Sequence, residues 1–416
     1  MRKLLNKAVI FFKKEHVTKY IIEISAFLIG FSLLVHLAVN DVVSNVFGTI
    51  VGFMISSMFL YLCKIIIGLL EDTMKINYNT EELLQIYHGC PEYRKSLESC
   101  GTKVEFAYAD LLINNDYSFS VVDNPTDYFE LDEFIHSNYT HLFSAHSNSA
   151  KKNFDTIRLD RFDSDTKTFY LSRSTYFNHL VTNRAVDFNL FEDVTLRNIY
   201  EYGPRLSPLE MSKMSNHIGI NGLVFLSDGR LLIPRRKTSS TISKNKITSS
   251  IAVMLNFPNE FSHNPKDAQI TTDYLLRGNI IKNLSDRVKL PKDAIDEAQT
   301  EIVFLGFGQN IYEGGKPQFY FMVKLNNIDT ATYFRKRKEY IDEQKRAGKK
   351  DFIDVDKCMY VADYNSFMYV KGHVKFTTYN EHNKPSQSTA GYEMSYLCNL
   401  WHYEKHKSSA IHPNKK

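Results

Sequence analysis

Two long apolar runs dominate the pattern of hydrophobic and polar positions near the start of the chain, at residues 21–39 and 46–70. Each reaches the roughly 20 residues that an α-helix needs to cross about 30 Å of hydrocarbon. Lysine and arginine are frequent before the first run and do not occur in the connecting residues 40–45. The positive-inside rule therefore predicts two transmembrane helices within residues 20–70, with both chain ends in the cytoplasm.

Small and charged residues inside these runs predict contacts between helices. Gly48 and Gly52 have the GxxxG spacing that allows close helix packing, and Ser56 extends the same face. Glu23 and Lys64 lie toward the cytoplasmic ends, where snorkelling to the interface is the simple explanation. The alternative is that they pair across the helices of an assembly. We therefore expect a homo-oligomer in a phospholipid bilayer.

The rest of the pattern divides the chain into further segments. Residues 1–19 place apolar positions between lysines, as in a basic amphipathic helix lying on a membrane surface. Residues 71–200 combine a helical connector with short alternating stretches, which predicts an α+β region. Residues 201–404 show the clearest alternation, and residues 405–416 form a basic tail.

Within residues 201–404, the tight turn Ser227-Asp228-Gly229 predicts a β-hairpin, with strands at 219–225 and 230–235. A helical period over 271–288 follows. Strands are then expected at 302–307 and 318–325, joined through a turn at Glu313-Gly314-Gly315.

Composition excludes several classes of site. A net charge of +4 on 416 residues does not indicate a duplex nucleic-acid partner. The five cysteines contain no CxxC pair, which argues against a structural zinc site or a disulfide framework. The fourteen histidines include no HxH or HExxH grouping, so we expect no metal.

The hairpin INGLVFLSDGRLLIPRR, followed by a helix and a strand pair, resembles the opening of a Nudix domain. The catalytic helix of that family carries paired glutamates that hold Mg²⁺. The best match here, residues 282–290 (KNLSDRVKL), keeps the apolar framework but has Asn283 and Arg287 where glutamates are expected, leaving only Asp286. Ala268 and Tyr274 occupy the positions of the leading glycine and glutamate. One carboxylate beside cations holds a hard dication poorly, whereas it leaves room for a direct contact with a phosphate anion.

A Nudix fold without its carboxylates, together with a membrane hairpin, resembles the transmembrane-Nudix effectors of bacterial cyclic-oligonucleotide-based antiphage signalling (CBASS). The resemblance covers the predicted transmembrane hairpin and residues 203–325. It implies a two-helix transmembrane hairpin plus a cytosolic α+β region containing a Nudix-like α/β/α sandwich. It also implies a non-enzymatic effector that binds a cyclic di- or trinucleotide made by a partner nucleotidyltransferase, assembles, and disrupts the inner membrane.

A cyclic nucleotide needs cations or hydroxyls for its phosphates, and aromatic faces and amides for its bases. We expect the charges and hydroxyls at the end of the second strand and at the start of the next one. The candidate ligand-binding residues are Arg235, Arg236, Lys237, Ser249, Ser250, Asn256, Tyr274, Lys282, Arg287, Tyr312 and Gln318. Arg235 and Arg236 alternate along a strand, so only one is expected to face the pocket. Lys282 and Arg287 have the alternative of being solvated helix residues.

Two other functions compete with the receptor hypothesis. A membrane-tethered Nudix pyrophosphatase would use Asp286 with acidic residues from elsewhere, such as Glu297 or Glu301. An interaction scaffold would bind no small ligand.

Overall fold

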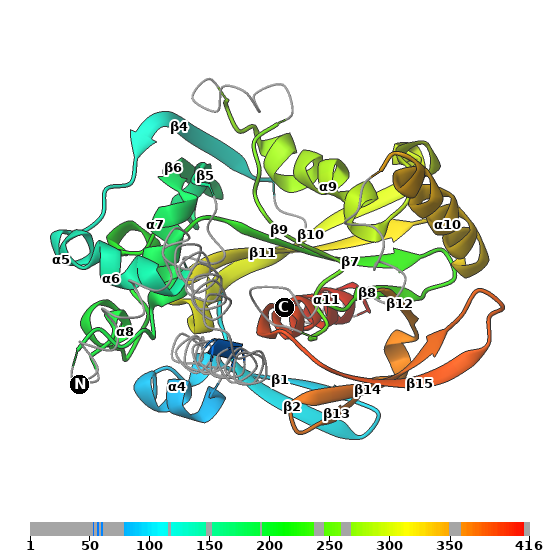
Figure 1. Cartoon of the computed structure of the whole chain (residues 1–416), viewed down its shortest axis with the longest axis horizontal. Coiled ribbons are helices and arrows are strands. Elements are labelled where there is room, and N and C mark those ends of the chain that lie inside the picture. The colour runs from blue at the N-terminus through cyan, green and yellow to red at the C-terminus, as the bar shows by residue number, and fades with distance from the viewer. Residues whose placement is uncertain are drawn as a thin grey trace, which may run out of the picture.

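The computed structural model describes residues 79–114, 118–146, 152–191, 194–236, 245–258, 268–348 and 359–411, together with Phe53, Ser56, Ser57 and Leu60. The described strands form a ten-stranded sheet, a three-stranded sheet and a two-stranded sheet, and helices pack against them (Figure 1). The described part of the chain is therefore a mixed α/β protein.

This architecture corrects two predictions from the sequence. The predicted fold class, a transmembrane hairpin plus an α+β region with a Nudix-like sandwich, is wrong, because the described fold is a mixed α/β arrangement around one large sheet. The predicted inner-membrane location is contradicted as well: within the described ranges, no helix combines the length and the apolar character needed to cross a bilayer. Of the two longest described helices, Thr330–Arg346 carries charged residues along its length and Met394–Ile411 carries them in its C-terminal half. Apart from four isolated positions, the predicted membrane helices within 20–70 lie outside the described residues.

The centre of the large sheet comes from the segment in which the β-hairpin was predicted. Strand β7 (Gly219–Leu226) is buried at every position, as expected for a central strand covered on both faces. It pairs with β8 (Leu231–Pro234) and β9 (Ile251–Met254) on one side and runs parallel to β11 (Lys316–Leu325) on the other. The predicted hairpin is thus present as β7 and β8.

Strands from both ends of the described chain complete the large sheet, in the order β13-β14-β12-β8-β7-β11-β10-β3. Strand β15 pairs with β14 beyond this path. The further strands are β3 (Ala109–Ile113), β10 (Thr300–Asn310), β12 (Met359–Ala362), β13 (Met368–Val370), β14 (His373–Tyr379) and β15 (Pro385–Gly391). Because β3 comes from the region 71–200, that region contributes to the same sheet as the C-terminal half.

Helices cover both faces of this sheet. On one face, α9 (Asn279–Val288) and α10 (Thr330–Arg346) pack with an apolar cluster that includes Leu284 and Tyr333. On the other, α11 (Met394–Ile411) contacts β7, β10 and β11 of the large sheet and also β1, so it lies between the central strands of that sheet and β1, which is drawn below it in Figure 1. A π-helical turn, Tyr274–Gly278, precedes α9 and lies within the helix predicted over 271–288.

The smaller sheets and short helices surround this core. The three-stranded sheet has the order β4-β6-β5, and the two-stranded sheet is β1-β2. Their strands are β1 (Arg94–Ser99), β2 (Thr102–Ala107), β4 (Ser120–Tyr128), β5 (Asp155–Asp163) and β6 (Thr168–Thr175). The short helices are α4 (Thr80–Ile86), α5 (Glu133–Ser137), α6 (Tyr139–Phe143), α7 (Tyr176–Val181) and α8 (Leu196–Tyr200).

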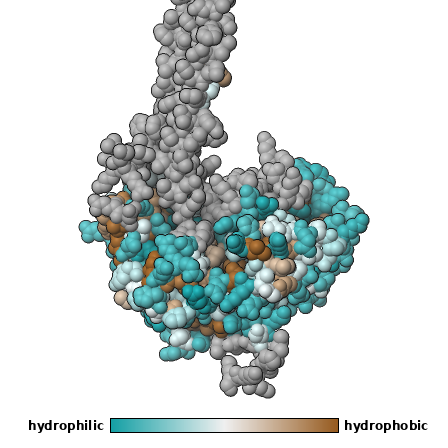
Figure 2. Space-filling view, turned by 90° about the horizontal axis from the view of Figure 1, so that it is seen from below, coloured by the Kyte–Doolittle hydropathy of each residue, from teal (hydrophilic) through white to brown (hydrophobic). Residues whose placement is uncertain are grey.

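The described surface is mostly hydrophilic on the face seen in Figure 2, with hydrophobic residues scattered among polar ones. Among the exposed large apolar side chains, Tyr202 and Met211 are the most exposed of the described residues.

Candidate functional site

Ser249 and Ser250 lie where the sequence places them, just before β9, but both are buried and bonded within the fold. The Ser250 hydroxyl donates to the carbonyl of Leu232 at 2.5 Å and accepts from the amide of Val224 at 2.9 Å. It therefore links β7 to β8 at the point where β9 begins. The Ser249 hydroxyl accepts from the side-chain amide of Asn399 on α11. The Ser250 hydroxyl therefore connects strands of the sheet, and the Ser249 hydroxyl connects the segment before β9 to α11.

We predict that Ser250→Ala lowers the free energy of unfolding by about 1–3 kcal/mol, because it leaves the buried Val224 amide without an acceptor. Urea denaturation measures this loss. Ser164→Ala, in an exposed turn, is the matched control and should change stability by less than about 0.5 kcal/mol. Equal effects of the two variants would contradict the structural role.

Tyr312 is likewise a core residue. Its side chain is 1% exposed, and its hydroxyl bonds the Thr80 hydroxyl at 2.9 Å and accepts from the amide of Ala107 at 3.1 Å. Burial raises the pKa of this phenol, so it stays neutral. It joins α4 and β2 to the turn after β10, and it does not offer a face for stacking.

The segment that follows β9 contacts the first part of the helical region around α9. Three predicted ligand residues lie at this contact: Asn256, Tyr274 and Lys282. The Tyr274 hydroxyl donates to the carbonyl of Asn256 at 2.8 Å, and the Lys282 ammonium donates to the carbonyl of Phe257. Both contacts use backbone carbonyls as acceptors. They fix the segment after β9 against the helix.

Gln318 is brought into a buried polar cluster at the start of β11. The parallel register places Gln318 opposite Gly219, and a side chain at 219 would collide with its amide, since an added Cβ would lie 2.0 Å from Oε1. The glycine therefore lets Gln318 reach across β7, where Oε1 accepts from Asn221 at 2.6 Å. Its Nε2 donates to Glu313 Oε2 at 3.3 Å.

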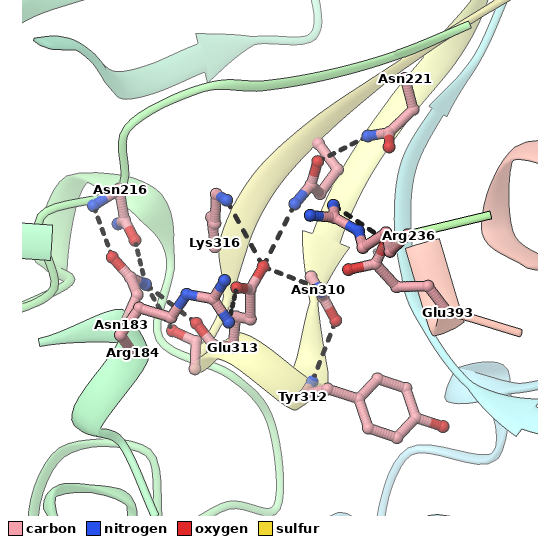
Figure 3. Close-up of polar contacts among 12 residues, drawn as sticks. Asn183, Arg184, Asn216, Asn221, Arg236, Asn310, Tyr312, Glu313, Lys316 and Glu393 are labelled. Atoms are coloured by element: carbon pink, nitrogen blue, oxygen red, sulfur yellow. Dashed lines mark hydrogen bonds and ion pairs between the residues drawn. The ribbon is translucent and has the colours of Figure 1, made fainter. Parts of the chain in front are cut away.

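Glu313 is the centre of this cluster (Figure 3). It lies in the turn between β10 and β11, and the left-handed Gly314 that follows it packs against Val186. Arg184 reaches Glu313 Oε1 at 3.1 Å, and Lys316 reaches Oε2 at 3.4 Å. Asn310 also donates to Oε2, at 3.2 Å.

The charged groups in this cluster change one another's pKa values. Burial opposes ionisation of Glu313, but Lys316 and Arg184 outweigh it and lower the pKa of Glu313 to about 2. Burial lowers the pKa of Lys316, with the charge of Glu313 acting in the opposite direction. The carboxylate is therefore ionised at neutral pH and neutralises only part of the positive charge around it.

A layer of neutral polar groups backs the cluster. The rings of His179 and His217 are in contact at a tilted angle, with centroids 3.7 Å apart, and burial lowers the pKa of each well below its ordinary value. Asn183 donates to Asn216 Oδ1 at 3.2 Å and to the carbonyl of Glu313 at 3.0 Å. This layer fixes the turn that carries Glu313 against the segment leading into β7.

Arg236 lies beside this cluster and faces Glu393 (Figure 3). A guanidinium nitrogen of Arg236 is 3.3 Å from Glu393 Oε2, and the two side chains are 29% and 14% exposed. Glu393 also interacts electrostatically with Lys246 and Lys316, which connects this pair to the buried part of the site.

Arg287 extends the positive charge onto α9. Arg287 is exposed to solvent, but the surrounding protein removes part of the water around its guanidinium group. This partial desolvation lowers its pKa. The positive charge of Arg236 lowers the pKa further, whereas Asp286 raises it. Two predicted ligand residues, Arg236 and Arg287, are therefore close enough for their charges to interact.

We call these charged residues the Glu313–Glu393 cluster. Its cations are Arg184, Arg236, Lys246, Arg287 and Lys316, and its carboxylates are Asp286, Glu313 and Glu393. Because the cations outnumber the carboxylates, the cluster attracts anions and repels hard cations. Within the part of the chain that the structure describes, no group of three or more His, Cys, Asp or Glu side chains could hold a metal ion.

Arg235 points elsewhere, as the alternation along a strand predicts. Its Nε donates to the carbonyl of Asn245 at 3.1 Å, and its NH1 lies 3.5 Å from the Tyr360 hydroxyl. Lys237 lies outside the described residues, as do Glu23, Gly48, Gly52 and Lys64. Ser56 is described only as a helical, partly exposed residue.

Sequence reasoning missed Arg184, Lys316 and Glu393 and identified Glu313 only as part of a turn. The one local signal was the charged pair Glu313 and Lys316 flanking two glycines. Comparison with protein-family models gives no match, and no curated protein matches the chain either.

Proposed function

We propose that the chain is a receptor that binds a phosphate-bearing nucleotide without hydrolysing it. The expected ligand is a cyclic di- or trinucleotide of the kind that a nucleotidyltransferase makes in CBASS antiphage signalling. The observation that carries this proposal is the excess of positive charge in the Glu313–Glu393 cluster, which reaches solvent at Arg236 and Arg287. Arginine is suited to this role because its planar fork donates two parallel hydrogen bonds to a phosphate.

The surroundings of Asp286 favour binding over hydrolysis. Metal-assisted hydrolysis of a diphosphate needs carboxylates grouped around Mg²⁺. Asp286 instead lies 3.5 Å from the Lys289 ammonium and beside Arg287, so cations surround the one carboxylate that the motif keeps. A pyrophosphatase using Glu297 or Glu301 has no observation in its favour, since both are exposed and neither contacts Asp286 through any described bond.

Isothermal titration calorimetry of the full chain tests this function. Cyclic di-AMP, cyclic di-GMP and cyclic tri-AMP serve as probes, and the expected result is saturable binding of at least one. Each binding probe is then incubated with the protein and Mg²⁺ and analysed by chromatography, where it should remain intact. Absence of binding by all three probes, or their hydrolysis, would overturn the proposal.

We predict that Arg236→Gln weakens binding of the responding probe by about 10- to 100-fold, because it removes a charge-assisted hydrogen bond to phosphate. Arg235→Gln is the matched control: it makes the same change one residue away, where the side chain points toward Asn245 and Tyr360. It should leave the dissociation constant unchanged. Circular dichroism establishes that both variants fold. Equal losses in the two variants would place the phosphate elsewhere.

A further inference from the structure

Arg236 and Glu393 are held in place by one stretch of backbone. The amide of Arg236 donates to the carbonyl of Lys246 at 2.9 Å, and the amide of Glu393 donates to the carbonyl of Ile247 at 3.0 Å. Ile247 also bridges to Arg235 on one side and to Tyr392 on the other. The two charged side chains therefore project from neighbouring, fixed positions, and their pairing requires little ordering of the chain.

Glu393 engages only part of the hydrogen-bonding capacity of the Arg236 guanidinium. One nitrogen of Arg236 meets Glu393, at 3.3 Å, which is longer than the usual 2.7–2.9 Å of a charge-assisted hydrogen bond. Arg236 Nε is buried and has no hydrogen-bond partner among the described residues. A guanidinium that donates only one long hydrogen bond to a carboxylate holds that carboxylate weakly, so a better-placed anion can displace it.

We propose that Glu393 is an internal competitor for Arg236 and that it sets a charge threshold for the ligand. This inference rests on the proposed function and deepens it. A ligand with a single phosphodiester only replaces the Glu393 carboxylate at Arg236, so its net gain in binding free energy is small. A ligand with two or more phosphate groups also contacts a neighbouring cation such as Arg287, and this second contact offsets the loss of Glu393.

Charge selectivity then depends on Glu393. In the wild-type protein, ligands with two or more phosphates bind, and ligands with one are rejected, whatever bases they carry. Removing the carboxylate frees Arg236 for either kind of ligand. The gain is expected to be larger for the singly charged ligand, which has no second contact to compensate for the competition.

The test compares the linear dinucleotide ApA, which has one phosphodiester, with the cyclic probe that binds best, by calorimetry on the full chain. Wild-type protein is expected to bind the cyclic probe at least about tenfold more tightly than ApA. Glu393→Gln is expected to tighten ApA binding about tenfold and to tighten the cyclic probe less. Glu105→Gln is the matched control, since it removes the same charge from the separate β1-β2 sheet, and it should change neither constant.

A double variant separates competition from positioning. If Glu393 acts through Arg236, Glu393→Gln has no effect on binding in a chain that also carries Arg236→Gln. Suppose that the wild-type protein binds the cyclic probe, but Glu393→Gln binds ApA no more tightly than wild type does. That result would overturn the charge threshold and leave the receptor function intact. No binding of any probe by wild type and Glu393→Gln would instead overturn the receptor function itself.

Discussion

Replacing Asp123 by alanine is expected to lower the free energy of unfolding by about 3–5 kcal/mol. Asp123 on β4 and Arg173 on β6 form a two-pronged ion pair, with nitrogen–oxygen distances of 2.6 and 2.9 Å, and their side chains are 1% and 0% exposed. The same residues bond the segment before α9: Arg173 donates to the carbonyl of Ala268 at 2.7 Å, and Asp123 accepts from the amide of Ile270 at 2.7 Å.

The size of the effect follows from what the variant leaves behind. Without Asp123, the guanidinium of Arg173 keeps its charge in a site from which water is excluded, and the amide of Ile270 loses its acceptor. Both effects destabilise the contact between the three-stranded sheet and the segment before α9. The variant therefore weakens the support of the helix that carries Arg287.

Urea denaturation followed by circular dichroism measures the loss. Asp127→Ala, an exposed position in the same strand, is the matched control and should remain within about 0.5 kcal/mol of wild type. Combining Asp123→Ala with Arg173→Met removes the unpaired charge and should restore a large part of the stability. A single variant as stable as Asp127→Ala would contradict the structural role of the pair.

The central elements of the fold could be predicted from the sequence because their signals are local. The turn Ser227-Asp228-Gly229 between two apolar runs defines β7 and β8, and the helical period before Leu290 defines α9. Proline ordinarily marks a turn, yet Pro125 lies within β4. There it occupies a strand at the edge of its sheet, one of the few strand positions that tolerate proline.

The candidate site was predicted only in part, for a physical reason. Arg236 and Arg287 carry exposed charge at the ends of local elements, so sequence patterns indicate them. Arg184 and Glu393 join the site through long-range contacts, which no local period records. Conversely, Ser250 and Tyr312 have side chains suited to binding, but the packing of distant strands uses their hydroxyls as structural bonds.

Replacing Glu313 by glutamine is expected to lower the free energy of unfolding by about 3 kcal/mol at neutral pH. The folded protein holds the pKa of Glu313 at about 2, against an ordinary value of 4.5. A carboxyl group whose pKa is depressed by folding contributes stability that is fully present above its ordinary pKa. That stability is lost as the pH falls from about 4.5 to about 2.

The pH dependence distinguishes this group from its charged neighbours. Burial of Lys316 lowers its pKa and imposes a penalty that is constant at acidic pH and changes only as the pH rises toward the ordinary lysine value of 10.5. Burial also lowers the pKa of His179 and His217, so both disfavour the folded state as the pH falls below 6.5. Wild type and Glu313→Gln share this loss while both histidines stay neutral in the folded protein, although the Glu313 charge also raises the pKa of His217. Urea denaturation of the two proteins at pH 7, 5, 4 and 3 should therefore give a difference in stability that is constant down to about pH 5 and then shrinks. A difference that stays constant to pH 3 would mean that Arg184 and Lys316 do not hold the Glu313 carboxylate ionised in the folded protein.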